Sequence, residues 1–203
     1  MSSRLDLWKT LTMMKINFFF NKNIAVILVS FLLALTPVSS FSFQLDKDPI
    51  DYDVLFKGSL KRGGKILNLS GKKIGDEGVE RLVSSSYLEK VEKIDLRYNE
   101  ITVVGAELLA KISPLPKLKS LILRHNILGD AGTTALAKSG SFPNLEEMQL
   151  GWTETRDAGA LAFGGSNKFK NLKKLDLRGN YLANKTKEEL KKSLGHLKTL
   201  KLF

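Results

Sequence analysis

The side chains that most often carry out catalysis or bind metal ions are scarce in this sequence of 203 residues. It contains no cysteine and two histidines, His125 and His196. That composition excludes disulfides, thiolate metal sites and a cysteine nucleophile, and it leaves too few histidines for a histidine-based zinc site. His125 has no acidic residue beside it, and Gly63-Gly64 lacks the Gly-x-x-x-x-Gly-Lys spacing of a phosphate loop. We therefore expect no enzyme, no cofactor and no small-molecule substrate.

Side chains suited to protein recognition recur instead at a constant spacing. Arg124 follows Arg97 after 27 residues, and Arg178 follows after 54 more. The position after the arginine carries an aromatic ring in three successive units. Arg, Tyr and Trp dominate the energetic centres of protein interfaces, because each offers a large, rigid contact area. We predict that the partner-binding residues are Arg97, Tyr98, Ile122, Arg124, His125, Gln149, Trp152 and Arg178.

The arginines have a second interpretation. Asp95 and Asp176 stand two residues before Arg97 and Arg178, so these arginines could pair with the acids as ordinary solvated surface. The aromatic residues vary from unit to unit, and an exposed Trp152 is harder to explain in that way.

A repeat positions these residues. The pattern Leu-x-Leu-x-x-Asn, as in Leu121 to Asn126, returns with small variations every 27 residues from Leu67 to Asn180, and Leu200-Lys201-Leu202 closes the series after 25 more. The alternation predicts short strands with one buried face, and Asn suits the turn that follows each strand because its amide bonds nearby backbone. Lys72 and Thr153 replace this Asn in two units, and we expect looser corners there.

The second half of each unit predicts a helix. Gly-Asp-x-Gly at Gly75 and Gly129 introduces apolar residues at helical spacing, with the acid placed to favour the positive end of its own helix dipole. Glycines return every 27 residues at Gly78, Gly105, Gly132 and Gly159, which indicates close packing of helix on strand. Thr186 with Glu189 predicts a capping box at the last helix.

Strand, Asn turn, Gly-Asp-x-Gly and helix together resemble the ribonuclease-inhibitor-like class of leucine-rich repeats over residues 65–203. The resemblance implies an α/β solenoid, a short horseshoe with parallel strands on its concave face, helices on its convex face, about five units and a closing strand. This class typically uses longer units and alternates Asn with Cys at the turn, whereas this chain has no Cys, so ribonuclease inhibition does not carry over. We expect a monomer that holds a protein partner on the concave face.

Two segments precede the repeats. Basic residues followed by the apolar run 24–35, with small residues at Val38 and Ser40, predict a signal peptide over residues 1–40. We therefore expect a secreted or periplasmic protein, and the alternative is an uncleaved membrane anchor, although 12 apolar residues are too few to span a bilayer of about 30 Å. Residues 41–64 carry Ile50, Val54 and Phe56, which we expect to form a cap over the first unit; a disordered linker is the competing interpretation.

The net charge of +11 raises a further alternative. Lysines gather near both ends of the repeat region, around Lys61 and around Lys191, and they could bind a polyanion such as a surface polysaccharide, a nucleic acid or an anionic lipid. A soluble charged coat is the simpler interpretation. Asn184-Lys185-Thr186 also matches a glycosylation acceptor, which only a eukaryotic host would use.

Overall fold

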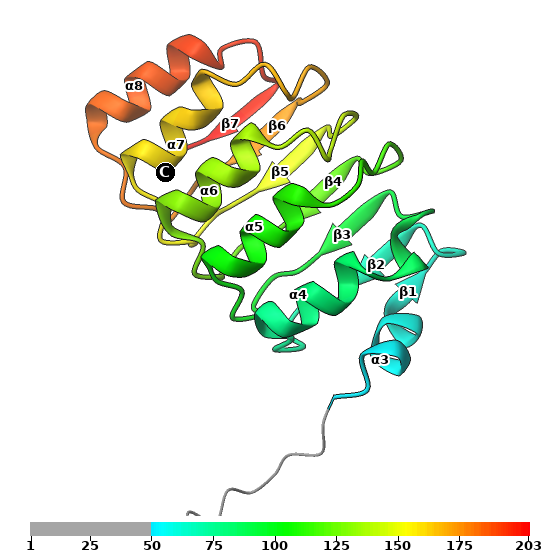
Figure 1. Cartoon of the computed structure of the whole chain (residues 1–203). Coiled ribbons are helices and arrows are strands. Elements are labelled where there is room, and N and C mark those ends of the chain that lie inside the picture. Colours follow the sequence, from blue (N-terminus) through cyan, green and yellow to red (C-terminus); the bar gives the residue numbers. More distant parts are fainter. Residues whose placement is uncertain (1–49) are drawn as a thin grey trace, which may run out of the picture. The chain divides into compact units, whose positions relative to one another are not determined.

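A computed structural model describes residues 50–203, which form one curved sheet with helices packed beside it (Figure 1). The strands are β1 (Leu60–Lys61), β2 (Ile66–Asn68), β3 (Lys93–Asp95), β4 (Ser120–Ile122), β5 (Glu147–Gln149), β6 (Lys174–Asp176) and β7 (Thr199–Lys201). The helices are α3 (Tyr52–Ser59), α4 (Gly75–Val83), α5 (Val103–Lys111), α6 (Gly129–Lys138), α7 (Asp157–Gly164) and α8 (Asn184–Ser193), with a 3-10 turn at Ser86–Leu88. The predicted signal peptide, residues 1–40, lies outside the described residues, as do residues 41–49.

The strands follow one another in sequence order, and every pair from β2 to β7 is parallel. Leu67, Ile94 and Leu121 stand directly beside one another across β2, β3 and β4, so the step of 27 residues is the register of the sheet. The inward residues of these strands are fully buried with the apolar face of each helix. The predicted α/β repeat solenoid is confirmed.

The Asn residues after the strands link neighbouring units. Asn126 donates from Nδ2 to the carbonyl oxygens of Leu96 (2.9 Å) and Leu123 (2.7 Å), and its Oδ1 accepts from the N–H groups of Asn99 (3.1 Å) and Ile101 (3.0 Å). Asn99 and Asn180 bond to the unit before them in the same way. Each side chain therefore satisfies backbone groups that the turn leaves without strand partners.

The expectation of a looser corner at Thr153 is wrong. Its side chain is fully buried, and its hydroxyl lies 2.7 Å from the Leu150 oxygen and 2.9 Å from Thr155 Oγ1. Thr155 also pairs with Thr133 at 2.7 Å. Buried hydroxyl groups that bond one another replace the amide at this corner.

The acids of the Gly-Asp-x-Gly sequences lie in the first turn of their own helices, as expected, but their hydrogen bonds go to the unit that follows. Oδ1 of Asp130 accepts from the N–H groups of Arg156 and Gly159, both at 2.8 Å, at the start of α7 rather than in its own helix α6. Asp157, at the same position in the related sequence Arg156-Asp157-Ala158-Gly159, accepts from the Ala183 N–H (2.9 Å) at the start of α8. The capping box predicted at Thr186 is not formed, because α8 begins at Asn184 and Thr186 lies inside the helix.

The recurrent glycines make room for these contacts between units rather than for packing of helix on strand. A Cβ at Gly159 would lie 2.7 Å from Asp130 Oδ1, and one at Gly132 would lie 2.9 Å from Ala106 Cβ on the preceding helix. The glycines do recur every 27 residues, as the sequence indicates. The reason for the recurrence is close contact with a neighbouring helix or with the aspartate that caps the next helix.

Residues 50–64 cover one end of the core. β1 pairs antiparallel with β2, and α3 places Phe56 against Tyr87, where it is buried. Ile50 and Val54 remain exposed, whereas Tyr52, Leu55 and Leu60 are partly buried and pack against the core together with Phe56. Between residues 50 and 203, every helix is too short or too polar to cross a membrane.

Candidate functional site

Helices α4 to α8 lie side by side on one face of the sheet (Figure 1). The opposite face, here called the open face, carries the outward residues of the strands and the first residues of the turns.

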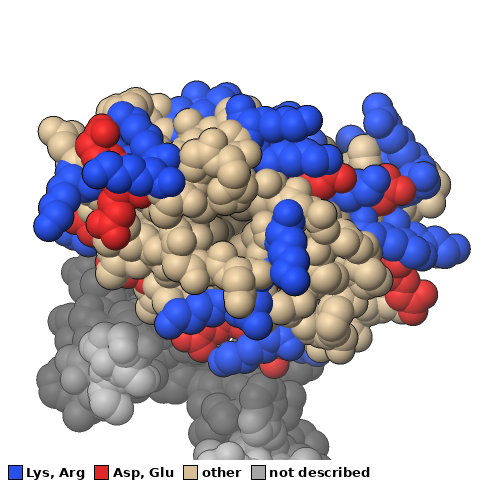
Figure 2. All heavy atoms as spheres, turned by 90° about the horizontal axis from the view of Figure 1, so that it is seen from above, with Lys and Arg blue, Asp and Glu red and all other residues tan. Residues whose placement is uncertain are grey.

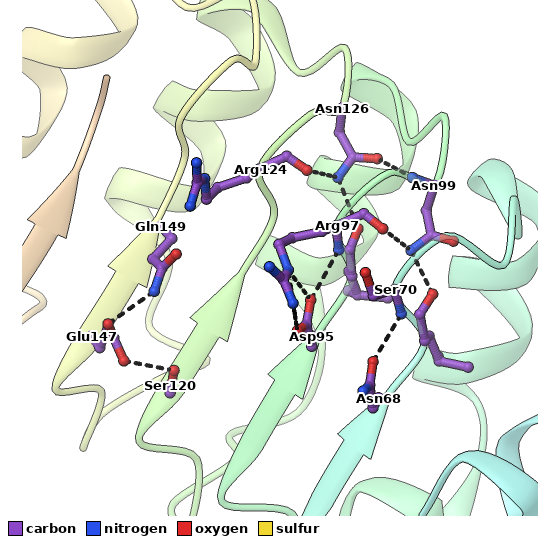
Figure 3. Close-up of polar contacts among 12 residues, drawn as sticks. Asn68, Ser70, Asp95, Arg97, Asn99, Ser120, Arg124, Asn126, Glu147 and Gln149 are labelled. Atoms are coloured by element: carbon purple, nitrogen blue, oxygen red, sulfur yellow. Dashed lines mark hydrogen bonds and ion pairs between the residues drawn. The ribbon is translucent and has the colours of Figure 1, made fainter. Parts of the chain in front are cut away.

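Two of the predicted arginines are held on the open face by internal ion pairs. Arg97 Nε and Nη2 donate to the two oxygens of Asp95 at 2.9 and 2.8 Å (Figure 3). Arg178 binds Asp176 in the same way at 3.0 and 2.7 Å.

These ion pairs are partly shielded from solvent, since the Asp95 and Asp176 residues are 4% and 7% exposed. Burial alone raises the pKa of Asp176, but the hydrogen bonds and charge of Arg178, with the nearby charge of Arg124, lower it by more. The pKa of Arg178 is raised by its hydrogen bond to Asp176. For Arg97 and Arg178 the pairing with the neighbouring aspartates is therefore observed, but the aspartates are buried rather than part of a solvated surface.

Arg124 differs from the other two arginines. The residue two positions before it is Ile122 rather than an aspartate, and it forms no ion pair among residues 50–203. Its side chain turns away from Arg97 and toward the strand of Gln149 (Figure 3), and its guanidinium carbon lies 4.8 Å from the centre of the Trp152 ring. Nε of Arg124 is buried without a hydrogen-bond acceptor.

Tyr98, His125 and Trp152, here called the aromatic row, lie in line across three units. The ring centres of Tyr98 and His125 are 4.2 Å apart with planes 9° from parallel, and those of His125 and Trp152 are 4.8 Å apart at 11°. Tyr98 is 53% exposed and Trp152 is 40% exposed. The alignment predicted from the spacing is observed; the binding role of these residues stays a prediction.

An unusual backbone conformation directs these rings outward. Strand alternation would point residue 98 in the same direction as the buried Leu96. The φ angles of Tyr98, His125 and Trp152 are 55°, 56° and 54°, in the left-handed region, and this reverses the direction of the side chain. The equivalent residues in the outer units are Gly71 and Gly179, with φ of 69° and 68°.

The two ends of the aromatic row are different. The Trp152 ring occupies the space above Gly179, where a Cβ would lie 2.3 Å from Nε1 of the indole. A Cβ at Gly71 would meet no atom within 4 Å. His125, in the middle, has a lowered pKa because of burial and the positive charges of Arg124 and Arg97, so its ring is neutral at pH 7.

A hollow of about 390 Å³ lies on the open face beside Arg124. Its charged and polar lining comes from the third, fourth and fifth units and the closing strand, and consists of Arg124, Glu147, Gln149, Lys174, Asp176, Arg178, Thr199 and Lys201. Gln149 donates to Glu147 at 2.9 Å, and Ser120 also donates to Glu147, at 3.1 Å (Figure 3). We refer to this region as the Arg124 hollow.

The structure separates the predicted residues into groups. Ile122 is only 4% exposed, so it supports the sheet and offers little surface to a partner. Arg97 and Arg178 are internally paired, whereas Arg124, Gln149 and the aromatic row remain accessible. The sequence analysis did not identify Gly151, which occupies the position that Arg124 holds in the preceding unit. Because Gly151 has no side chain, Arg124 can lie across it; a Cβ there would be 3.5 Å from Arg124 Nε.

The comparisons with known proteins agree with the repeat geometry. A family model described as a leucine-rich repeat matches residues 65–83, 87–110 and 115–137, and another leucine-rich repeat model matches residues 171–200. The chain is a leucine-rich repeat protein. No curated protein sequence matches it. Leucine-rich repeats are typical protein-binding modules and generally lack enzymatic activity; the ribonuclease-inhibitor-like subclass stays a prediction for this chain.

Neither family match extends over residues 138–170. The unit formed by these residues nevertheless has a strand and a helix, β5 and α7, like the units beside it. It is the unit in which Gly151, Trp152 and Thr153 replace the Arg-x-Asn sequence of the turns after β3, β4 and β6. In residues 50–203 there is no group of three or more acidic or histidine side chains that could hold a metal ion.

Proposed function

We propose that this leucine-rich repeat protein is a non-enzymatic binding module that holds a protein partner on its open, concave face. The contact is centred on the aromatic row and Arg124. The observation that carries this proposal is the row of three stacked rings that the left-handed turn conformation directs outward, with Tyr98 53% and Trp152 40% exposed.

That conformation is unfavourable for residues other than glycine, by roughly 1–2 kcal/mol each. Glycine occupies the same position in the outer units without this cost. Stacking of two aromatic pairs returns about 0.5–1.5 kcal/mol per pair, which offsets only part of the cost of three such residues. The left-handed conformation belongs to this turn in every unit, and Glu100 and Glu154 also adopt it, with φ of 60° each. What sets the three central units apart is that a large ring stands where glycine would avoid the cost, and binding of a partner accounts for that choice of residue.

The composition of the open face supports a protein partner. Tyr98 and Trp152 expose rigid rings that lose little conformational entropy on binding, and Arg124 already lies against the indole. The row spans three adjacent strands and therefore offers a continuous contact rather than isolated side chains.

We further propose that the protein is exported by the predicted signal peptide, residues 1–40, so that it meets its partner outside the cytoplasm, as a monomer. An uncleaved signal that anchors the domain to a membrane is the alternative. The support is the pattern of basic, apolar and small residues in this segment.

Binding of a polyanion by the terminal lysines has weaker support. Lys65 pairs with Glu92 at 3.0 Å, and Lys191 pairs with Glu188 at 2.8 Å. On the face seen in Figure 2, Lys and Arg side chains form several separate groups with acidic residues among them rather than one continuous basic surface. A polyanion requires a continuous track of positive charge.

The proposal is tested by capture of partners from cell extract and culture medium with the tagged full chain. Trp152→Gly removes an aromatic ring and installs the residue that occupies this position at Gly179, so the variant is expected to fold. We expect it to lose most of the captured protein, whereas Tyr181→Ala, which removes an exposed ring outside the row, retains it. Identical capture by wild type and Trp152→Gly would exclude the open face as the binding site.

A further inference from the structure

We propose that the Arg124 hollow receives a single carboxylate side chain from an acidic segment of the partner. This inference rests on the proposed function, because it names the chemistry that one part of the open face recognises. Arg124 provides the charged donors, and Trp152 and Gly151 hold its side chain in place.

The comparison of equivalent positions shows why Arg124 is available. In the units of β3 and β6 an aspartate two residues before the arginine binds both Nε and Nη2 of that arginine. In the unit of β4 this position is Ile122, which is as deeply buried as Asp95 and has no acceptor. The central unit therefore has the arginine of the repeat without the internal carboxylate that neutralises it elsewhere.

Arg124 is also held in one orientation. Its guanidinium carbon lies 4.8 Å from the Trp152 ring centre, and its Nε lies against the bare backbone of Gly151. Because Nε is buried, the donors that a partner can reach are on Nη1 and Nη2, which match the two oxygens of a carboxylate. A planar guanidinium fixed in this way loses little entropy when it binds.

The size and charge of the hollow favour one carboxylate over a polymer of anions. Four basic and two acidic residues line it, a net formal charge of +2. A volume of about 390 Å³ is enough for one or two side chains rather than an extended strand. Glu147 and Asp176 lie in the same wall and would repel a second carboxylate inside the hollow, so the neighbouring carboxylates of an acidic segment remain outside it.

The test uses the internal pair of the neighbouring units as a competitor. Ile122→Asp places a carboxylate two residues before Arg124, in the arrangement that Asp95–Arg97 and Asp176–Arg178 already adopt, so it occupies Arg124 without removing it. Arg124→Gln removes the charge directly. Lys138→Gln, at the exposed end of α6 on the helical face, is the control with the same change in net charge.

Binding is measured in the full chain carrying Trp8→Phe, in which Trp152 is the sole tryptophan and lies beside the hollow. The probe is acetylated, amidated hexaglutamate, with hexaglutamine as the neutral control. We expect a saturable change in Trp152 fluorescence with hexaglutamate alone, and affinity about tenfold lower in both Ile122→Asp and Arg124→Gln, the loss expected for one hydrogen-bonded charge pair. Lys138→Gln should remain within about twofold of the parent.

Three results would overturn the inference: no saturable binding of hexaglutamate, an equal loss in Lys138→Gln, or unchanged affinity in folded Ile122→Asp. A heparin fragment that binds equally to the parent and to Ile122→Asp, while hexaglutamate does not bind, would assign the basic residues to a polyanion instead. If hexaglutamate fails while capture of partners still depends on Trp152, the protein-binding function stands and the acidic partner is rejected.

Discussion

The carboxylate of Asp130 caps the helix that follows its own, since Oδ1 accepts hydrogen bonds from the N–H groups of Arg156 and Gly159 at 2.8 Å each. Asp76 stands in the same relation to α5, where it accepts from Thr102 and Gly105. The first turn of a helix has N–H groups without internal acceptors. Because the acceptor comes from the preceding repeat, a change at one helix start weakens the contact between two units.

Asp130→Ala should therefore lower the free energy of unfolding by about 1–2 kcal/mol, the usual cost of losing a helix cap. Urea unfolding followed by circular dichroism measures this difference. Glu80→Ala, which removes an exposed acid of α4, should change stability by less than about 0.5 kcal/mol. Equal effects of the two substitutions would show that the Asp130 contact does not stabilise the fold.

Gly71 and Gly179 allow the effect of the Trp152 ring to be separated from backbone strain. Both have φ near +69°, so alanine should cost about 1 kcal/mol at either position. Only at Gly179 does the new Cβ meet the indole, at 2.3 Å. We expect Gly179→Ala, but not Gly71→Ala, to move the Trp152 ring and shift its fluorescence emission. The same emission spectrum in both variants would contradict the packing of Trp152 on Gly179.

The fold could be predicted because every unit of the repeat places apolar residues at the same positions, and each unit must bury them against the next. Five occurrences of the Leu-x-Leu pattern at one spacing determine both the strand direction and the register, and Leu67, Ile94 and Leu121 stand in that register. The alignment of Tyr98, His125 and Trp152 follows from the same spacing.

What could not be predicted are the contacts between units. The sequence places Asp130 four residues after Asn126 at the start of its own helix, and nothing local shows that its carboxylate reaches Gly159, 29 residues away. The hydroxyl cluster of Thr133 and Thr155 is similarly distant along the chain. Which arginines are paired could be foreseen from Asp95 and Asp176, but the direction of Arg124 depends on the space above Gly151 in the next unit.

Asn126 provides a test of the hydrogen bonds by which the Asn side chains link neighbouring turns, here called the buried ladder. Its buried amide makes hydrogen bonds to Leu96, Leu123, Asn99 and Ile101, and alanine would leave these backbone groups without partners. We expect Asn126→Ala to lower the free energy of unfolding by about 3 kcal/mol. Asn171→Ala, at an exposed amide that also bonds to the preceding unit, should cost less than about 1 kcal/mol. A cost at Asn126 no greater than at Asn171 would reject a structural role for the buried ladder.

His125 makes the aromatic row sensitive to pH. Its pKa is lowered by burial and by Arg124 and Arg97, so the unfolded chain binds a proton at a higher pH than the folded chain does. Stability contributed by the neutral ring is therefore complete above pH 6.5 and decreases as the pH falls through the folded-state pKa. His125→Phe keeps a ring in the row but cannot titrate. We expect the free energy of unfolding of wild type to fall relative to that of His125→Phe between pH 6.5 and 5. Urea unfolding at each pH measures this difference. Parallel curves of the free energy against pH over this range would contradict the burial of a neutral His125 between Tyr98 and Trp152.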